Sequence, residues 1–575
     1  MEENKTDLEK VLSGERLSVP EDTIVPGTVH IVDIDGNLNV KKSKSGKGNI
    51  ILQPQPSDNP NDPLRWKKLK KHAQFWLLWW WAFLLAVTVN WSGPIWTEWT
   101  ELFNCTYMQL NISSALSFLF LGVGCIFLQP TAMKLGRRFV YLLCTVLAIV
   151  ANIIGGVSTN VNYLYAANVL GGLAAAPVDS LVEISTMDVF FQHERAEYLS
   201  WFILALYAGS DLGPVACGYI VERMSWRWCY WIQVIIFGVL FVIQLFFMED
   251  TTFYRGDNEI EENILQQIKS EEVVLTAIKS GEIPQDNGNK YLIQKTRRAD
   301  DDLSGDEIDS VNHSIPKRTY LQKLRLIEIE YNDPRTWPTI FIRPFFLIPF
   351  PAILWGGLVY GSQMMWLSLL ATTQSEIYAV SPYYFSTAQV GLTNIGALVG
   401  SILGMVYGGK FVDWLTIRLA IRNKGILEPE FRLWAMVLPA LLNAAGLLAY
   451  GLGSVYEAHW AVSVVLGQGF LGFAMGSSGG ICLTYTVDSY AHLASEGLVL
   501  MLFIRNCIGM GFTFAIQPWL DVCGLSLTTW LMFMISLVIN CSFILMVIFG
   551  KRFRRMTLNI YHIISEPTFG EYFKS

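Results

Sequence analysis

Residues 228–248, WCYWIQVIIFGVLFVIQLFFM, contain no charged side chain. A helix needs roughly 20 apolar residues to cross about 30 Å of hydrocarbon. The segment also lacks the alternation of apolar and polar residues that is typical of a membrane β-strand. It therefore predicts a membrane-spanning helix, in which every backbone polar group is satisfied within the segment.

Eleven further segments share this length and apolar character. Across 575 residues, 52% of the side chains are hydrophobic and 16% are charged, which is too apolar for one soluble core. We therefore predict an all-α membrane protein with twelve transmembrane helices. The expected spans are 73–95, 113–132, 138–158, 162–187, 198–221, 228–248, 344–371, 387–408, 434–453, 459–486, 496–520 and 527–549.

The spans fall into two groups of six, separated by a polar stretch that is acidic and poor in aromatic residues. This composition is typical of a flexible linker. Short basic loops follow the second and the eighth spans, which indicates duplication and two six-helix bundles around a central site. The expected divisions are a cytoplasmic N-terminal tail (1–72), an N-terminal bundle (73–249), a cytoplasmic linker (250–340), a C-terminal bundle (341–550) and a cytoplasmic C-terminal tail (551–575).

Lysine and arginine residues predict the orientation. They precede the first span in LRWKKLKKH and follow the second, eighth and twelfth spans, whereas the connectors after the first, third, seventh, ninth and eleventh spans contain none. Positive residues stay cytoplasmic, so both termini are expected inside the cell, with Arg223 and Arg227 as exceptions. Residues 1–72 are polar and charged, so we expect insertion to begin with the first span rather than with a cleaved signal peptide.

Five N-x-[ST] sequons are present, at Asn4, Asn104, Asn111, Asn312 and Asn540. The predicted topology places only Asn104 and Asn111 outside the cell, so these two are candidate glycosylation sites. Asn104 is the better acceptor, because Asn111 lies close to the second span. Unused sequons are the alternative.

Three carboxylates interrupt apolar segments. Asp179 and Glu183 lie in YLYAANVLGGLAAAPVDSLVEISTM, and Asp211 lies in LSWFILALYAGSDLGPVACGYIV. A charge at mid-bilayer costs roughly 3 kcal/mol even on a lenient scale, so such residues usually face a cavity and bind a positive group. Neighbouring like charges in a low dielectric do not all stay ionised, so at least one acid is expected to hold a proton. The alternative is that Arg505 neutralises one acid and another only caps a polar pocket.

Other polar residues also lie within predicted spans. Arg505 and Asn506 are expected about 14 Å deep in span eleven. A buried arginine needs an acidic partner, such as Asp488, Glu496 or a carboxylate across the cavity. Tyr207, one turn before the third acid, and Tyr485 are candidate cation-π faces. The predicted substrate and proton site comprises Asp179, Glu183, Asp211, Asn506, Tyr207 and Tyr485.

The sequence also disfavours several classes of function. No histidine lies deep inside a predicted span and no Cys/His set has ligand spacing, so we expect no metal and no haem. The phosphate-binding pattern GxxxxGK[ST] does not occur, which disfavours an ATP-driven pump. We expect a transport protein driven by an ion gradient rather than an enzyme, without cofactors or nucleic-acid partners.

Six motifs indicate a family. They are NDPLRW (61–66), GxxxGPxxxG (209–218), SWRWCYW (225–231), EDTTFYRG (249–256), RNKGILEPEFRLW (422–434) and the series YTVDSY, EGLVLMLFIRNCIG and QPW. In this order they resemble the fungal twelve-span drug:proton antiporter branch of the major facilitator superfamily, most closely its polyamine and histidinol-type transporters. The resemblance covers about residues 60–554 and implies the major facilitator fold, with transport by alternating access.

The resemblance also implies partners and a location. The substrate would be a small organic cation such as a polyamine, exchanged for protons by a monomer in the lipid bilayer. The protein would be a multi-pass protein of the plasma membrane, with an internal membrane of the endoplasmic reticulum or vacuole as the alternative.

Two loops correspond to the family's conformational latch. In KLGRRFV, Gly136 makes the turn before Arg137 and Arg138, and Arg137 is expected to reach Asp188 at the cytoplasmic end of span four. Asp413 is the corresponding acid in the second half. The alternative is a simple salt bridge between helix ends.

The sequence departs from the family pattern at two positions. Met133 replaces the usual acid of the first loop, and Ala167 stands where span four often has an arginine. The latch is therefore expected to be reduced, and the acids of span four are expected to lack a family cation that would neutralise them.

Span five contains Gly209, Gly213 and Gly218 around Pro214. Small residues on one face allow close helix approach, and the proline allows a bend. The motif predicts either a contact on which the bundles rock or a tight packing seam.

Three functional hypotheses follow. The first is a proton-coupled carrier in which Asp179 and Glu183 hold ammonium groups. The second keeps the fold but exports hydrophobic drugs, and it predicts that Glu183→Gln is tolerated. The third is a nutrient sensor that does not transport and signals through the 250–340 linker or the tails.

Overall fold

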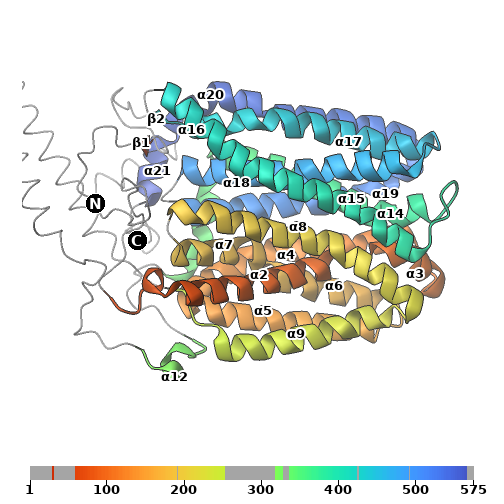
Figure 1. The fold of residues 1–575 in the computed structure, drawn as a ribbon, viewed down its shortest axis with the longest axis horizontal. Coiled ribbons are helices and arrows are strands. Elements are labelled where there is room, and N and C mark those ends of the chain that lie inside the picture. Colours follow the sequence, from red (N-terminus) through yellow and green to blue (C-terminus); the bar gives the residue numbers. More distant parts are fainter. Residues whose placement is uncertain are drawn as a thin grey trace, which may run out of the picture.

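The computed structural model shows one elongated bundle of helices (Figure 1). It describes residues 29–30, 59–190, 192–252, 318–327, 336–423, 426–490 and 493–565. Most of the predicted linker, most of the N-terminal tail and the sequons at Asn4 and Asn312 lie outside these residues.

The first bundle begins after the short turn η1 (Pro63–Arg65), whose start is capped by the Asp62 carboxylate. Span four is divided where Pro177 follows Ala176, because proline cannot donate its backbone nitrogen to a continuous helix. The helices are α2 (Lys68–Asn90), α4 (Tyr107–Leu135), α5 (Arg137–Gly156), α6 (Val161–Ala175), α7 (Pro177–Val189), α8 (Gln192–Arg223) and α9 (Arg227–Phe247), with the short η2 (Gly93–Ile95) and α3 (Trp96–Leu102) between α2 and α4.

The second bundle follows the short helices α12 (Tyr320–Lys323), α13 (Trp337–Ile342) and η3 (Arg343–Leu347). Its elements are α14 (Pro351–Tyr378), α15 (Thr387–Val406), η4 (Tyr407–Phe411), α16 (Val412–Arg422), η5 (Pro429–Met436), α17 (Val437–Val455), η6 (Val462–Gln468), α18 (Gly469–Ser489), α19 (Ala494–Cys541), α20 (Phe543–Met556) and α21 (Leu558–Ser565). Two short strands, β1 (Val29–His30) and β2 (Ile426–Leu427), pair antiparallel with Val29 opposite Leu427.

Eleven helical segments of the described chain are long and apolar enough to cross a membrane. The longest, Ala494–Met556, contains two spans because its backbone leaves the helical region at Gly524 (φ 68°, ψ 164°). Glycine accepts this positive φ without steric cost. The predicted all-α fold, with twelve transmembrane helices in two six-helix bundles, is therefore confirmed.

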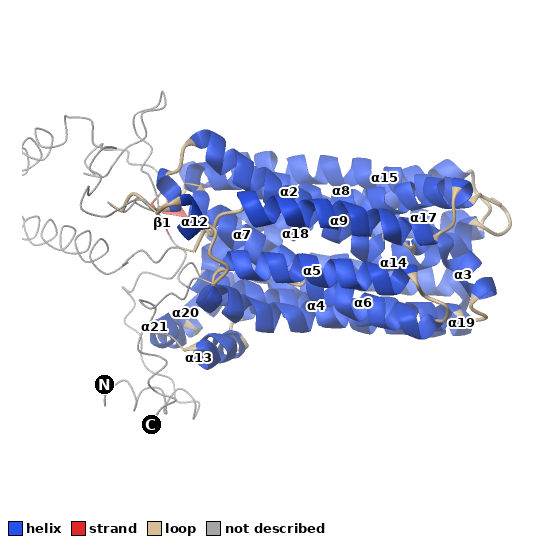
Figure 2. Cartoon of the chain, turned by 90° about the horizontal axis from the view of Figure 1, so that it is seen from below, coloured by secondary structure: helices blue, strands red, loops and turns tan. Residues whose placement is uncertain are grey.

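The two bundles lie side by side, with α2 to α9 in one and α14 to α20 in the other (Figures 1 and 2). The pairs α8 with α15 and α4 with α19 form their main contacts. Separate cores stabilise the bundles, one around Trp81 and Phe237 and another around Trp366 and Tyr378.

Ion pairs gather at one end of the molecule, where α2, α5 and α8 begin and α20 ends. We call this the basic end. Arg137 pairs with Asp188 there, and the other described pairs are Lys70 with Glu249 (2.5 Å), Lys323 with Glu249 (3.8 Å), Arg432 with Asp413 and Asp488 (2.9 Å each), Lys551 with Glu428 (2.5 Å), Arg343 with Glu496 (3.2 Å) and Arg554 with Glu430 (2.6 Å).

The end of the chain differs from the predicted tail. Helix α20 continues to Met556, and α21 buries Tyr561 and Ile564 against the second bundle. These apolar residues recur every three positions from Leu558, so they lie on one face of a helix.

Candidate functional site

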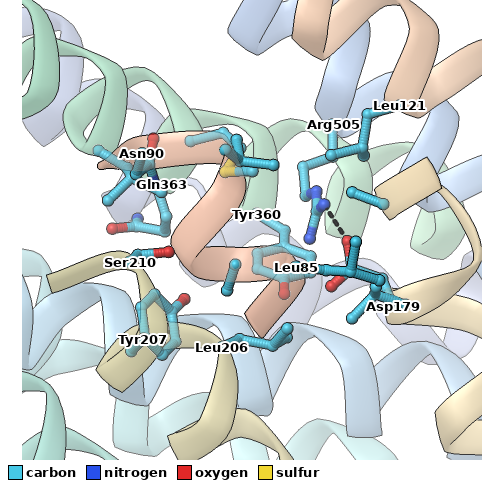
Figure 3. Close-up of a pocket in the computed structure, with 16 residues that line it drawn as sticks. Leu85, Asn90, Leu121, Asp179, Leu206, Tyr207, Ser210, Tyr360, Gln363 and Arg505 are labelled. Carbon is cyan, nitrogen blue, oxygen red and sulfur yellow. Dashed lines mark hydrogen bonds and ion pairs between the residues drawn. The ribbon is translucent and has the colours of Figure 1, made fainter. Parts of the chain in front are cut away.

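A cavity with an empty volume of about 620 Å³ lies between the two bundles (Figure 3). Sixteen residues from α2, α4, α6, α7, α8, α14 and α19 line it. Nine of them carry aliphatic or thioether side chains, and Tyr207 and Tyr360 add two aromatic rings. The remaining five are the polar residues Asn90, Asp179, Ser210, Gln363 and Arg505.

Asp179 and Arg505 form an ion pair across this cavity (Figure 3). Asp179 belongs to the first bundle and Arg505 to the second, and both are buried, with Arg505 only 2% exposed. The guanidinium group also donates to the Asn506 Oδ1 (3.2 Å) and lies 4.7 Å from the centre of the Tyr360 ring. One acid of span four thus pairs with Arg505, which is the alternative that the sequence left open, whereas Ala167 supplies no cation from span four itself.

Local sequence explains the position of Asp179. It lies in the first turn of α7, where the positive end of the helix dipole stabilises a carboxylate. The preceding small residues bring span four close to α4, since a Cβ added at Gly172 would lie 2.3 Å from the Ser117 carbonyl oxygen. The Cys125 thiol donates to the Ala176 carbonyl oxygen (2.9 Å) at the break before α7.

Glu183 lies one turn after Asp179 and is buried beside it. It does not line the cavity, and its Oε2 atom has no hydrogen-bond partner among the described residues. Burying a charged carboxylate without a partner is far more costly than burying a neutral acid. The arrangement is therefore suited to a carboxyl group that exchanges a proton.

Asp211 does not join the other two acids. It is buried on α8 beside Ser401 of α15, outside the cavity wall, and its Oδ2 atom lacks a partner in the described chain. The prediction of one three-acid site is therefore not supported for Asp211.

Of the remaining predicted site residues, one lines the cavity and two do not. Tyr207 lines the cavity and donates its hydroxyl to the Met475 carbonyl oxygen (2.8 Å) in the other bundle. Asn506 lies behind Arg505 and is fully buried. Tyr485 does not line the cavity, because its ring packs against Trp355 (5.6 Å between ring centres) near the basic end.

Sequence reasoning missed four polar residues of the cavity wall. Asn90, Ser210, Tyr360 and Gln363 all line it. A signal was present for the two amides, because Asn and Gln within apolar spans need polar partners or a cavity.

The span-five glycines contact two different helices. A Cβ at Gly209 would lie 2.4 Å from the Phe83 carbonyl oxygen of α2, within the first bundle. A Cβ at Gly218 would lie 2.7 Å from the Thr387 carbonyl oxygen of α15, in the second bundle. Gly213 faces α2, and the Pro214 carbonyl faces Gly391 of α15. The motif therefore packs α8 within its own bundle and also against the other one.

We expect Gly218→Leu to lose most transport while the protein still reaches the membrane. The new side chain would overpack the α8–α15 contact, at a cost of about 1–3 kcal/mol in the conformation that closes it. Gly238→Leu is the matched control, because a Cβ there meets nothing within 4 Å. Equal flux in both variants, normalised to protein in the membrane, would contradict the prediction.

The loops of the predicted latch form ion pairs. Gly136 has a φ of 95° at the turn, and Arg137 pairs with Asp188. Arg138 instead donates to the carbonyl oxygens of Leu245 (2.7 Å) and Arg325 (3.0 Å). In the second half, Arg432 lies 2.9 Å from Asp413 and 2.9 Å from Asp488.

The two sequons that were predicted to face outside differ in exposure. Asn104 is exposed in the loop between α3 and α4. Asn111 is 1% exposed, and its amide donates to the Gln517 Oε1 (3.3 Å). This burial leaves no space for a glycan on Asn111. No group of described His, Cys, Asp and Glu residues has the geometry of a metal site.

Comparisons with known proteins agree with this architecture. The family model described as Major Facilitator Superfamily matches residues 78–501. An uncharacterized MFS-type transporter of Schizosaccharomyces pombe is 31% identical over 94% of each chain. Protein HOL1 of Saccharomyces cerevisiae is 28% identical over 93% of this chain and 96% of its own. The solved structure of the proton:xylose symporter XylE bound to 6-bromo-6-deoxy-D-glucose has a TM-score of 0.53 over 86% of this chain and 100% of its own, at 14% identity, and so resembles the fold alone.

Proposed function

Since the chain belongs to the major facilitator superfamily and is a secondary transporter, we propose that its cavity carries a small organic cation, such as a polyamine, in exchange for protons. The observation that carries the proposal is the ion pair between Asp179 and Arg505, which joins the two bundles inside the cavity. An ammonium group competes with Arg505 for the same carboxylate. Binding of the substrate thus replaces a contact between the bundles by a contact with the substrate.

Aromatic rings support a cationic ligand. Tyr207 and Tyr360 line the cavity, and the Tyr360 ring already holds the Arg505 guanidinium at 4.7 Å. A desolvated cation over an aromatic face is stabilised by about 2 kcal/mol. The substrate cation and the Arg505 guanidinium can therefore occupy the face of the Tyr360 ring in turn.

Glu183 supplies the proton exchange in this proposal. When Asp179, Glu183 and Arg505 are all ionised, these three buried side chains together carry one net negative charge. Either a proton on Glu183 or one bound substrate charge neutralises it, and a neutral group is the least costly to keep out of water. Exchange of one cation for the other keeps the buried charge constant, which is the requirement for antiport.

The test is flux of labelled spermidine in reconstituted vesicles with an imposed pH gradient. Asp179→Asn is expected to lose both exchange and accumulation. Glu183→Gln is expected to retain spermidine exchange at equal pH but to lose accumulation driven by the gradient. Glu101→Gln, an exposed acid on α3, is the control. Full accumulation in Glu183→Gln would rule out Glu183 as the proton carrier.

A second candidate is export of amphipathic drugs, which the nine aliphatic or thioether residues of the cavity wall favour. It predicts drug resistance on expression and tolerance of Glu183→Gln. Resistance in that variant together with absence of spermidine flux would favour this candidate.

We also propose an orientation with the basic end in the cytoplasm of a plasma-membrane protein. This end contains most of the described ion pairs, and basic residues are retained on the cytoplasmic side. In this orientation Asn104 faces outside.

A further inference from the structure

The two bundles also meet at the end opposite the basic end. Asn111 of α4 donates its side-chain amide to the Gln517 Oε1 of α19 at 3.3 Å. Both residues are buried, so the two bundles are in contact at this end as well.

Two acids surround this contact. The Gln517 Nε2 donates to the Asp521 Oδ1 (3.2 Å), and Glu376 of α14 lies near the same amide and within electrostatic range of Asp521. Among the described residues, no Lys, Arg or His forms an ion pair with Glu376 or Asp521.

The cluster also contains acceptors without donors. The Asn111 Oδ1 and the Glu376 Oε2 are buried and lack a hydrogen-bond partner in the described chain, and Asn111 is 1% exposed. A buried acceptor without a donor is destabilising, and a buried carboxylate without a cation is more so. A positively charged group with several N–H donors would satisfy both of these acceptors.

The surroundings would attract such a group. The described helix ends and loops on this side contain two arginines, Arg223 and Arg227, one histidine, His459, and no lysine. The acids on the same side are Glu98, Glu101, Glu222, Glu376, Glu457 and Asp521. An excess of acids around an opening raises the local concentration of cations.

We propose that Glu376, Asp521 and Asn111 form a second binding site, which takes an organic ammonium ion at the end of the bundles opposite the basic end. The carboxylates come from the second bundle and the Asn111 carbonyl group from the first, so the bound cation bridges the bundles and favours closure of this end. The substrate class rests on the proposed function, whereas the site itself rests on the unpaired acids and acceptors.

Transport kinetics provide the first test. The double variant Glu376→Gln/Asp521→Asn is expected to raise the half-saturating spermidine concentration about tenfold at low ionic strength, and less at high salt, where surface electrostatics are screened. The maximal rate is expected to stay within about twofold, because the central ion pair is intact. Glu457→Gln removes one exposed acid at the same end and therefore measures the general electrostatic contribution, which is expected to be much smaller than tenfold. An unchanged half-saturating concentration in the double variant would overturn the proposal.

A binding test does not depend on transport. In detergent-purified Asp179→Asn protein, in which the central site is impaired, spermidine is expected to raise the unfolding temperature, because a ligand stabilises the state that binds it. The triple variant with Glu376→Gln and Asp521→Asn is expected to lose this shift. An equal shift with sodium chloride at matched ionic strength would overturn the assignment to an organic ammonium ion.

The outcomes separate the two proposals. If spermidine raises the unfolding temperature only when Glu376 and Asp521 are present, the outer site is supported. If the same protein shows no proton-driven spermidine flux, the proposed function is rejected. Flux that requires Asp179, together with equal shifts in the Asp179→Asn and triple variants, supports the function and rejects the outer site.

Discussion

Arg505→Met is expected to abolish transport and to lower the unfolding temperature. The substitution leaves Asp179 buried without its cation, and removal of one partner of a buried ion pair costs about 3–5 kcal/mol. Arg505→Lys is expected to be intermediate, because a compact ammonium lacks the planar fork that contacts both Asp179 and Asn506. Thermal unfolding in detergent and spermidine flux in vesicles measure the two effects.

The double variant Arg505→Met/Asp179→Asn separates stability from function. It contains no unpaired charge, so most of the lost stability is expected to return. Transport is expected to stay absent, because no carboxylate remains in the cavity wall to receive the substrate. Recovery of both properties would show that the pair has only a structural role.

Arg554→Met is expected to have a comparably large effect on stability without a change in substrate affinity. Arg554 is completely buried and donates three hydrogen bonds to Glu430, at 3.0, 2.8 and 2.6 Å. Its loss is expected to cost about 3–5 kcal/mol and to reduce the amount of folded protein, because Glu430 is left charged and buried. The half-saturating spermidine concentration of the surviving protein is expected to be unchanged, since neither residue lines the cavity.

Two further variants check this explanation. Arg554→Met/Glu430→Leu is expected to recover most of the stability, because an apolar pair replaces the ionic one. Lys551→Met breaks the neighbouring pair with Glu428, but the lysine side chain is 47% exposed, so an effect of only about 0–1 kcal/mol is expected. Equal losses in Lys551→Met and Arg554→Met would contradict the dependence on burial.

The position of an acid along its span could be predicted from sequence, whereas the direction of its side chain could only be predicted in part. Asp179 lies nine residues before Asp188, about 14 Å along span four, and the structure locates it in the cavity wall. Asp211 was predicted to share the same site, but the structure places it beside Ser401 of α15. A signal was available, because Asp211 precedes Pro214 by three residues and Gly218 by seven. Those two residues face α15, so Asp211 faces α15 as well.

Pairs between distant residues could not be predicted. Arg505 was expected to need an acidic partner, but nothing in one sequence distinguishes Asp179, 326 positions away, from nearer acids. The same is true of Arg554 and Glu430, which are 124 positions apart. The segment RNKGILEPEFRL contains both acids and cations, but only the packing of α20 against η5 shows which residues meet.

The break before Pro177 gives span four a mechanical property. Helix α7 is a rod of 13 residues that begins at this break and carries Asp179, Glu183 and Asp188 along its length. Asp179 and Asp188 are about 14 Å apart at the helical rise of 1.5 Å per residue. If α7 tilted, the carboxylate in the cavity, the buried carboxyl group and the partner of Arg137 would move together. One helix therefore connects the cavity wall to the ion pair at the basic end.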